Sequence, residues 1–185
     1  MTADEYLHWS QEQPDGRYEL VSGEVVMMSP ETVRHVAVKN QAWLTFRNAI
    51  EKARLSYRAY GDGVGVRVDQ FTVREPDMSI QCKPVSPDSL LLDEPVVVVE
   101  VILPTSVRSD TGAKVAEYFK VPSVRHYLII DPFNSAVIRH SRPDEGAVMM
   151  TEIHRSGLIV LDPPGLTVRT EDLLFNDTNQ DQETP

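Results

Sequence analysis

One stretch of this 185-residue chain constrains its fold more than any other: Pro95-Val-Val-Val-Val-Glu100-Val-Ile102. Almost every position is β-branched, which is typical of a strand buried on both faces in the middle of a sheet. Glu100 is the exception, because a carboxylate is seldom buried without a partner or a metal ion. The alternative is that Glu100 ends the strand and pairs with an arginine or a helix terminus. The sequence therefore predicts a central strand carrying either a functional acid or a firmly paired one.

Helical and strand-like segments alternate around this strand. A capping box, Thr2-x-x-Glu5, predicts a short first helix, and apolar spacing predicts a long amphipathic helix over about 33–54. Further helices are expected over 109–120 and 170–175. Strands are expected over 17–21, 24–28, 57–60, 64–68, 76–82, 96–102, 124–131, 136–140, 147–153 and 158–161. This order predicts an α/β (α+β) fold, a central mixed β-sheet flanked by helices with additional β-hairpins. We expect one domain over 1–175 and a polar, frayed tail over 176–185.

Composition excludes several classes of protein. The single cysteine, Cys82, excludes an intrachain disulfide framework and an all-cysteine zinc site. No apolar run approaches the ~20 residues that span a bilayer, so we expect no membrane partner. The acidic N-terminus lacks the pattern of a signal peptide. These features together predict a cytoplasmic protein.

The formal net charge of -10 argues at first against binding to nucleic acid. That charge is unevenly distributed: residues 1–32 carry -6, 33–74 carry +5, 75–100 carry -5, 101–142 carry +3 and 143–185 carry -7. The basic segment coincides with the predicted long helix. Its side chains could follow a phosphate backbone, although a solvated helix face is the commoner meaning of such a run. The basic residues on or just past this helix are Arg34, Lys39, Arg47, Lys52, Arg54 and Arg58.

Two further acids occupy strand-like positions similar to that of Glu100. Asp77 follows Pro76 at the start of a predicted strand, and Glu19 lies in the first predicted hairpin. For Glu19, an exposed strand residue is an equally acceptable interpretation. Three acids on sheet elements, followed one helix later by Lys114, make a recognisable set of candidate functional residues.

The blocks around these residues carry a family resemblance. They are Arg17-Tyr-Glu-Leu-Val-Ser-Gly, Glu75-Pro-Asp-Met-Ser-Ile80, Val97-Val-Val-Glu-Val-Ile-Leu-Pro, Asp110-x-x-x-Lys114-x-x-x-Tyr118 and Val124-Arg-His-Tyr-Leu-Ile-Ile-Asp-Pro132. Over residues 2–140 the chain resembles the putative restriction endonuclease family of the PD-(D/E)XK nuclease superfamily. The resemblance implies a restriction-endonuclease-like core and a metal-dependent DNA endonuclease.

The resemblance also implies roles for the acids and the lysine. Asp77 and Glu100 would bind Mg²⁺ or Mn²⁺, with the Val101 carbonyl as a third ligand, because Mg²⁺ prefers oxygen ligands. Lys114 would assist the attacking water, and its alternative is a solvated residue paired with Asp110. Glu19 would complete the catalytic set by ligating a second metal or holding a metal-bound water.

Arg34, His35 and Lys39, at the start of the long helix, would contact substrate, and for His35 local packing is the alternative. The chain departs from the superfamily pattern at Ile102, where a lysine is usual, and from the family at Ser123, His126 and Leu128. The missing lysine and the acidic balance favour a second hypothesis, a catalytically silent module that binds nucleic acid or a protein partner. A third is a non-nuclease domain whose acids bind Ca²⁺ incidentally. Because restriction-like nucleases often pair to cut both strands, we also expect a homodimer.

Overall fold

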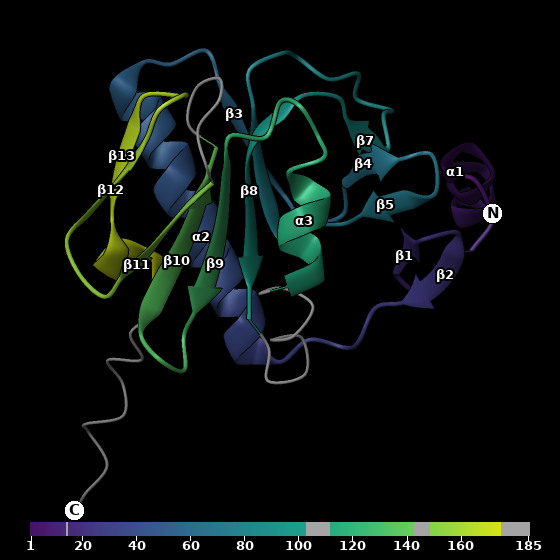
Figure 1. The fold of residues 1–185 in the computed structure, drawn as a ribbon, viewed down its shortest axis with the longest axis horizontal. Helices are drawn as coiled ribbons and strands as arrows, with labels where there is room; N and C mark the ends of the chain where they lie inside the picture. Colours follow the sequence, from purple (N-terminus) through teal and green to yellow (C-terminus); the bar gives the residue numbers. More distant parts are fainter. Residues whose placement is uncertain (14, 103–111, 143–148, 175–185) are drawn as a thin grey trace, which may run out of the picture.

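The computed structural model describes residues 1–13, 15–102, 112–142 and 149–174. Its main sheet has six strands in the order β11-β10-β9-β8-β6-β3 (Figure 1). The strands β8 and β9 are parallel and the other neighbours are antiparallel, so the sheet is mixed. The strands are β3 (Arg58–Gly61), β6 (Met78–Gln81), β8 (Pro95–Val101), β9 (His126–Asp131), β10 (Ala136–Ser141) and β11 (Met150–His154). The predicted fold, a mixed sheet flanked by helices, is confirmed.

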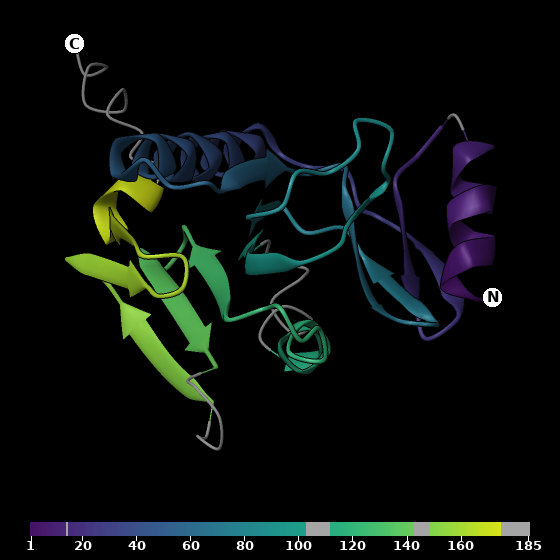
Figure 2. The same cartoon turned by 90° about the horizontal axis from the view of Figure 1, so that it is seen from above.

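Helices α2 and α3 lie on opposite faces of this sheet (Figure 2). The long helix α2 (Val33–Ala53) begins after the N-cap Thr32 and ends at Arg54, whose φ of 53° lies in the left-handed region. The short helix α3 (Lys114–Tyr118) lies on the opposite face. The predicted helix over 109–120 is therefore seen from Lys114 onward, while 109–111 lie outside the described residues.

Strand β8 supplies side chains to the cores on both faces. Val97, Val99 and Val101 pack with the apolar side of α2, whereas Val98 and Ile102 pack with Val115 and Tyr118 beside α3. All seven residues of β8 are buried, as the β-branched run predicts. Glu100 therefore points to the α3 face, since side chains alternate along a strand.

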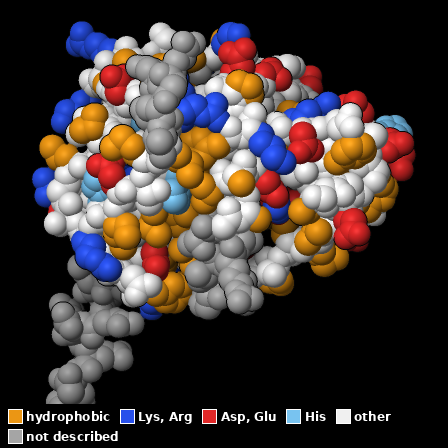
Figure 3. Space-filling model, in the orientation of Figure 1, with side chains coloured by type: hydrophobic (Ala, Val, Ile, Leu, Met, Phe, Trp, Pro, Cys, Tyr) orange, Lys and Arg blue, Asp and Glu red, His pale blue; other side chains and the backbone are white. Residues whose placement is uncertain are grey.

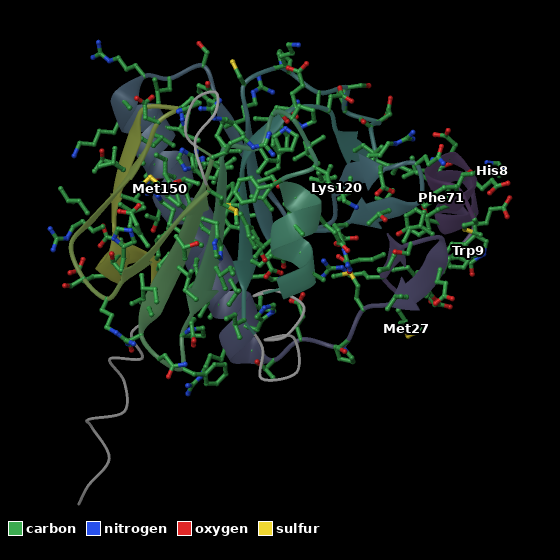
Figure 4. The ribbon with its side chains drawn as sticks, in the orientation of Figure 1. His8, Trp9, Met27, Phe71, Lys120 and Met150 are labelled. Atoms are coloured by element: carbon green, nitrogen blue, oxygen red, sulfur yellow. The ribbon has the colours of Figure 1, made fainter. Side chains whose placement is uncertain are left out.

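A second, five-stranded sheet with the order β2-β1-β5-β4-β7 lies at the N-terminal end of the molecule. Its elements are α1 (Ala3–Gln11), β1 (Tyr18–Val21), β2 (Glu24–Met27), β4 (Gly65–Asp69), β5 (Thr72–Arg74) and β7 (Leu91–Leu92). The predicted hairpin turns at Ser22-Gly23, where both residues have positive φ. Met27 and Phe71 extend from this sheet into solvent, and Lys120 pairs with Asp69 between α3 and the β4–β5 turn (Figure 4).

The C-terminal part covers the α2 face of the main sheet. It consists of the hairpin β12 (Leu158–Leu161) and β13 (Leu166–Arg169), followed by α4 (Thr170–Leu173). Ile159, Leu161, Leu166, Val168 and Leu173 join the core cluster that contains the apolar side of α2. No helix within the described ranges is long and apolar enough to cross a membrane. The expected tail over 176–185 lies outside the described residues.

Candidate active site

Asp77 directly precedes β6, and Glu100 lies in the neighbouring strand β8 of the main sheet. The antiparallel register pairs Met78 of β6 with Val99 of β8, so its continuation by one residue sets Asp77 opposite Glu100. Both side chains are buried, with exposures of 6% and 4%. Directly opposed residues in such a ladder have Cβ atoms about 5 Å apart. The two acids that the sequence singles out are thus neighbours in register, with the Asp77 carboxylate contacted by α2 and the Glu100 carboxylate by α3.

The carboxylate of Asp77 is held by the backbone of β8 and approached by α2. The Val101 amide donates to Asp77 Oδ2 at 2.7 Å. His35, in the first turn of α2, lies with Nε2 2.9 Å from the Val101 carbonyl oxygen and 3.5 Å from Asp77 Oδ2. His35 therefore contacts both the acid and the carbonyl that the family resemblance implies as metal ligands.

The electrostatic environment of His35 favours its protonated form. Burial works against the charge, but the hydrogen bond to Asp77, the charge of Asp77, the Val101 carbonyl and Glu31 together raise the pKa of His35 above its ordinary value. A partly buried imidazolium between two carboxylates compensates negative charge when no metal ion does so.

Glu100 is anchored from the opposite face by α3. Lys114 Nζ donates to Glu100 Oε1 at 2.8 Å, and the Tyr118 hydroxyl donates to the same oxygen at 2.7 Å. Lys114 is buried rather than directed to bulk solvent. Burial, reinforced by the charge of Glu100, raises the pKa of Tyr118 well above its ordinary value, so its hydroxyl remains a donor. The lysine in the following helix therefore reaches the acid of the strand. Its suggested partner Asp110 lies outside the described residues.

Glu19 lies in the same buried region but is engaged differently. Arg74 donates to Glu19 Oε2 at 2.7 Å, the Glu75 amide donates to Oε1 at 3.0 Å, and Lys114 Nζ is 4.0 Å from Oε1. Arg74 also pairs with Glu117 of α3 at 2.6 Å. The exposed-strand interpretation of Glu19 is wrong, since its exposure is 8%.

The three predicted substrate contacts have different surroundings. Arg34 is exposed at the start of α2, whereas His35 is buried inside the site. Lys39, one turn further along α2, is also buried, with ion pairs to Glu31 and Asp62 at 2.6 and 2.5 Å. Because Lys39 is buried and paired with two acids, a role within the site is favoured over contact with a substrate phosphate.

Sequence reasoning missed Arg74 and Glu31. Arg74 directly precedes Glu75-Pro76-Asp77, and this proximity to the acid was its only local signal. Glu31 lies just before α2, and its partners Arg17 and Lys39 are 14 and 8 residues away. Pairing at such separations follows from the tertiary fold rather than from a motif.

The donor set fits a hard divalent cation. Asp77, Glu100 and the Val101 carbonyl offer oxygen ligands in a buried site, which suits Mg²⁺ or Mn²⁺. Within the described part of the chain, Glu31, His35 and Asp77 form a group whose potential ligand atoms all lie within 4.8 Å of one another. Glu19 and Glu100 lie outside this group, which extends the site toward α2.

Comparisons with known proteins agree with this architecture. A family model described as a putative restriction endonuclease, Uma2, matches residues 3–172. The uncharacterized protein slr1290 of Synechocystis is 22% identical over 169 residues, covering 90% of this chain and 87% of the relative. The crystal structure of a putative nuclease belonging to DUF820 from Anabaena variabilis superimposes with a TM-score of 0.71 at 17% identity. The match covers 94% of this chain and 97% of that protein, and it shows a shared fold.

Proposed function

The chain belongs to the putative restriction endonuclease family, and on that premise we propose that it is a metal-dependent endonuclease that hydrolyses phosphodiester bonds in DNA. One observation carries the proposal: two buried acids, Asp77 directly before β6 and Glu100 in the adjacent β8, with a buried lysine bonded to Glu100. A packed core alone needs no such charges, because burying each one costs several kcal/mol before it is paired.

In this proposal the ion is Mg²⁺ or Mn²⁺, held by Asp77, Glu100 and the Val101 carbonyl. When bound, such an ion offsets the charge that develops on the phosphate and lowers the pKa of a coordinated water. Asp77 is oriented for this task by the Val101 amide. Glu100 is oriented by the Tyr118 hydroxyl and by Lys114. The two ligands are thereby fixed before a cation arrives, which limits the cost of ordering them.

Lys114 would orient the attacking water and stabilise negative charge on the phosphate. Its ammonium is already desolvated beside Glu100, so electrostatic interactions there are stronger than in water. Glu19, 4.0 Å from Lys114, would steer that ammonium, while Arg74 keeps the Glu19 carboxylate in position. His35 would hold the Val101 carbonyl and Asp77 in register, and exposed Arg34 would contact a phosphate of the substrate.

A second candidate function is a catalytically silent nuclease fold that binds nucleic acid or a protein. The observation in its favour is Ile102, which stands where the superfamily usually has lysine and is buried in the core beside α3. Lys114 partly compensates for the missing lysine, because it brings an ammonium group to Glu100 from α3 instead of from the position after β8.

A plasmid-nicking assay with Mn²⁺ tests the proposal. The wild-type chain is expected to nick supercoiled DNA, and Asp77→Asn, which keeps the shape of the side chain, is expected to lose activity by about 100-fold or more, because metal catalysis contributes several kcal/mol. Exposed Asp88→Asn is the matched control and should retain wild-type nicking.

Absence of metal-dependent nicking by the wild type, or equal nicking by Asp77→Asn, would favour the silent module. Parallel digestion of single-stranded DNA and RNA defines the substrate class. Because restriction-like nucleases often pair to cut both strands of a duplex, the proposal includes a homodimer, which light scattering would detect.

A further inference from the structure

Three carboxylates, those of Glu31, Asp62 and Asp77, surround the ammonium of Lys39 next to the proposed metal site. We call this group of acids the carboxylate pocket. Lys39 Nζ is 2.6 Å from the Glu31 carboxylate, 2.5 Å from Asp62 Oδ2 and 3.6 Å from Asp77 Oδ1. The ammonium thus contacts three acids from three parts of the chain: the segment before α2, the turn after β3 and the segment before β6. Only 6% of Lys39 is exposed.

The composition of this pocket is that of a hard-cation site. Three carboxylates converging on one point are the ligands that Mg²⁺ and Mn²⁺ prefer. They would repel one another strongly if no cation lay between them. The outer side is closed by Arg17, whose Nη1 is 3.1 Å from Glu31 Oε1 and 2.9 Å from Asp62 Oδ2.

An independent observation also points into this pocket. His35 is 5% exposed, and its Nδ1 atom has no hydrogen-bond partner within the described residues. That nitrogen faces Glu31 Oε2 at 3.6 Å, too far for a hydrogen bond. A buried imidazole nitrogen aimed at a carboxylate group becomes a potential further ligand when a metal ion displaces its proton.

We propose that Lys39 is a built-in cation that occupies the place a second divalent ion would take beside Asp77, so that the centre binds a single metal ion. The proposal rests on the proposed function, since it concerns the neighbour of that metal site. Lysine suits the task because its ammonium is a compact point charge with three donors. Its carboxylate partners at hydrogen-bond distance, Glu31 and Asp62, are both outside the predicted catalytic set.

This assignment gives Lys39 a positioning role through Asp77. An ammonium at 3.6 Å attracts Oδ1, while the Val101 amide holds Oδ2. Asp77 is therefore oriented from two sides. A single positive charge also leaves the site more negative than a second divalent ion would, which preserves affinity for the one catalytic ion.

The experiment measures Mn²⁺ stoichiometry on the full chain by electron paramagnetic resonance of the free ion, with isothermal titration calorimetry in parallel. The wild type is expected to bind one Mn²⁺ per chain. Lys39→Met, which keeps the length of the side chain without its charge, is expected to bind two. The double variant Lys39→Met/Glu31→Gln should return to one, because the vacated pocket loses a ligand. Lys52→Met, on the exposed part of α2, is the control and should bind one.

The measured Mn²⁺ stoichiometry distinguishes a failure of the role proposed for Lys39 from a failure of the proposed nuclease centre. Two ions bound by the wild type, or equal numbers bound by the wild type and a folded Lys39→Met, would overturn the role of Lys39 while leaving metal-dependent nicking intact. A wild type that binds none, with a Lys39→Met variant that binds one, would support the role of Lys39 and contradict the proposed nuclease centre.

Circular dichroism checks the fold of each variant. If Lys39→Met is unfolded without metal, its recovery by Mn²⁺ at a stoichiometry of two supports the proposal, and failure to recover overturns it. Lys39→Gln provides a second neutral variant, with the same expected gain of one ion.

Discussion

At the scale of single residues, His126 of β9 contributes a dependence of stability on pH. It is 3% exposed, and burial, aided by the charge of Arg139, lowers its pKa from 6.5 to about 4. The folded state therefore keeps His126 neutral where the unfolded state binds a proton. The stability contributed by neutral His126 is fully present above about pH 6.5 and is lost as the pH falls toward 4.

We expect His126→Gln to weaken this acid sensitivity. The shift corresponds to roughly 3 kcal/mol between the two ends of the window, since one pKa unit is about 1.4 kcal/mol. Urea unfolding at several pH values between 4.5 and 7.5, compared between wild type and variant, measures the difference. The comparison also removes the opposite contribution of His35, whose raised pKa adds stability at low pH. Exposed His8→Gln is the control, and equal pH slopes for wild type and His126→Gln would contradict the assignment.

Residues of the candidate site differ in how far the sequence could predict them. Glu100 was visible because it interrupts an apolar strand, and Asp77 and Lys114 because they fall in family-like blocks. Burial of Lys39 could not be predicted from its helix, since its partner Asp62 is 23 residues away. Likewise, Arg74 meets Glu19 at a separation of 55 residues. From the sequence alone, a charged side chain is predicted to be solvated unless its long-range partners are known.

At the scale of elements, Arg74 connects three of them: it extends from β5 to Glu19 of β1 and to Glu117 of α3. Arg74→Met is expected to destabilise the protein by about 3–5 kcal/mol, because two carboxylates would stay largely buried without their cation. Arg67→Met removes an exposed pair with Asp4 and should cost about 1 kcal/mol or less. Guanidinium unfolding of both variants makes the comparison. Similar losses would contradict the role of Arg74, and Arg74→Lys replaces Arg74→Met if the latter does not fold.

The long elements are predictable from periodicity, and some of the short ones are not. The helix expected over 33–54 is α2, and the strand expected over 96–102 is β8. The strands β5, β7 and β13 are not predicted, since they have only three, two and four residues. In a segment as short as β7, local sequence carries too few positions to show an alternation.

At the scale of the whole molecule, the structure changes the meaning of the basic segment 33–74. Lys39 and Arg74 are buried in ion pairs with acids and are not available to DNA. On the face in Figure 3, acidic and basic side chains are interspersed rather than gathered into one basic surface. With a net charge of -10, we therefore expect weak, salt-sensitive binding to DNA.

Arg34 is the exposed basic residue nearest to the site in sequence, adjoining His35. Arg34→Gln is expected to weaken DNA binding and to reduce the slope of log K against log salt by about 0.9, the value for one lost phosphate contact. Fluorescence anisotropy over a series of NaCl concentrations, with Ca²⁺ in place of Mn²⁺, measures this slope. Arg155→Gln, beyond β11, is the control and should leave the slope unchanged, whereas equal slopes for wild type and Arg34→Gln would contradict the contact.

The acids of the site belong to the sheet and its lysine belongs to a helix, so the two kinds of residue can change in different ways as the sequence diverges. Asp77 and Glu100 are tied to a backbone register, so inserting or deleting one residue in β8 would turn Glu100 to the α2 face and separate it from Lys114. The acids can therefore change only by replacement in place. Lys114 belongs to a separate helix that only has to point an ammonium at Glu100, so that charge could be supplied from another position over generations without rebuilding the sheet.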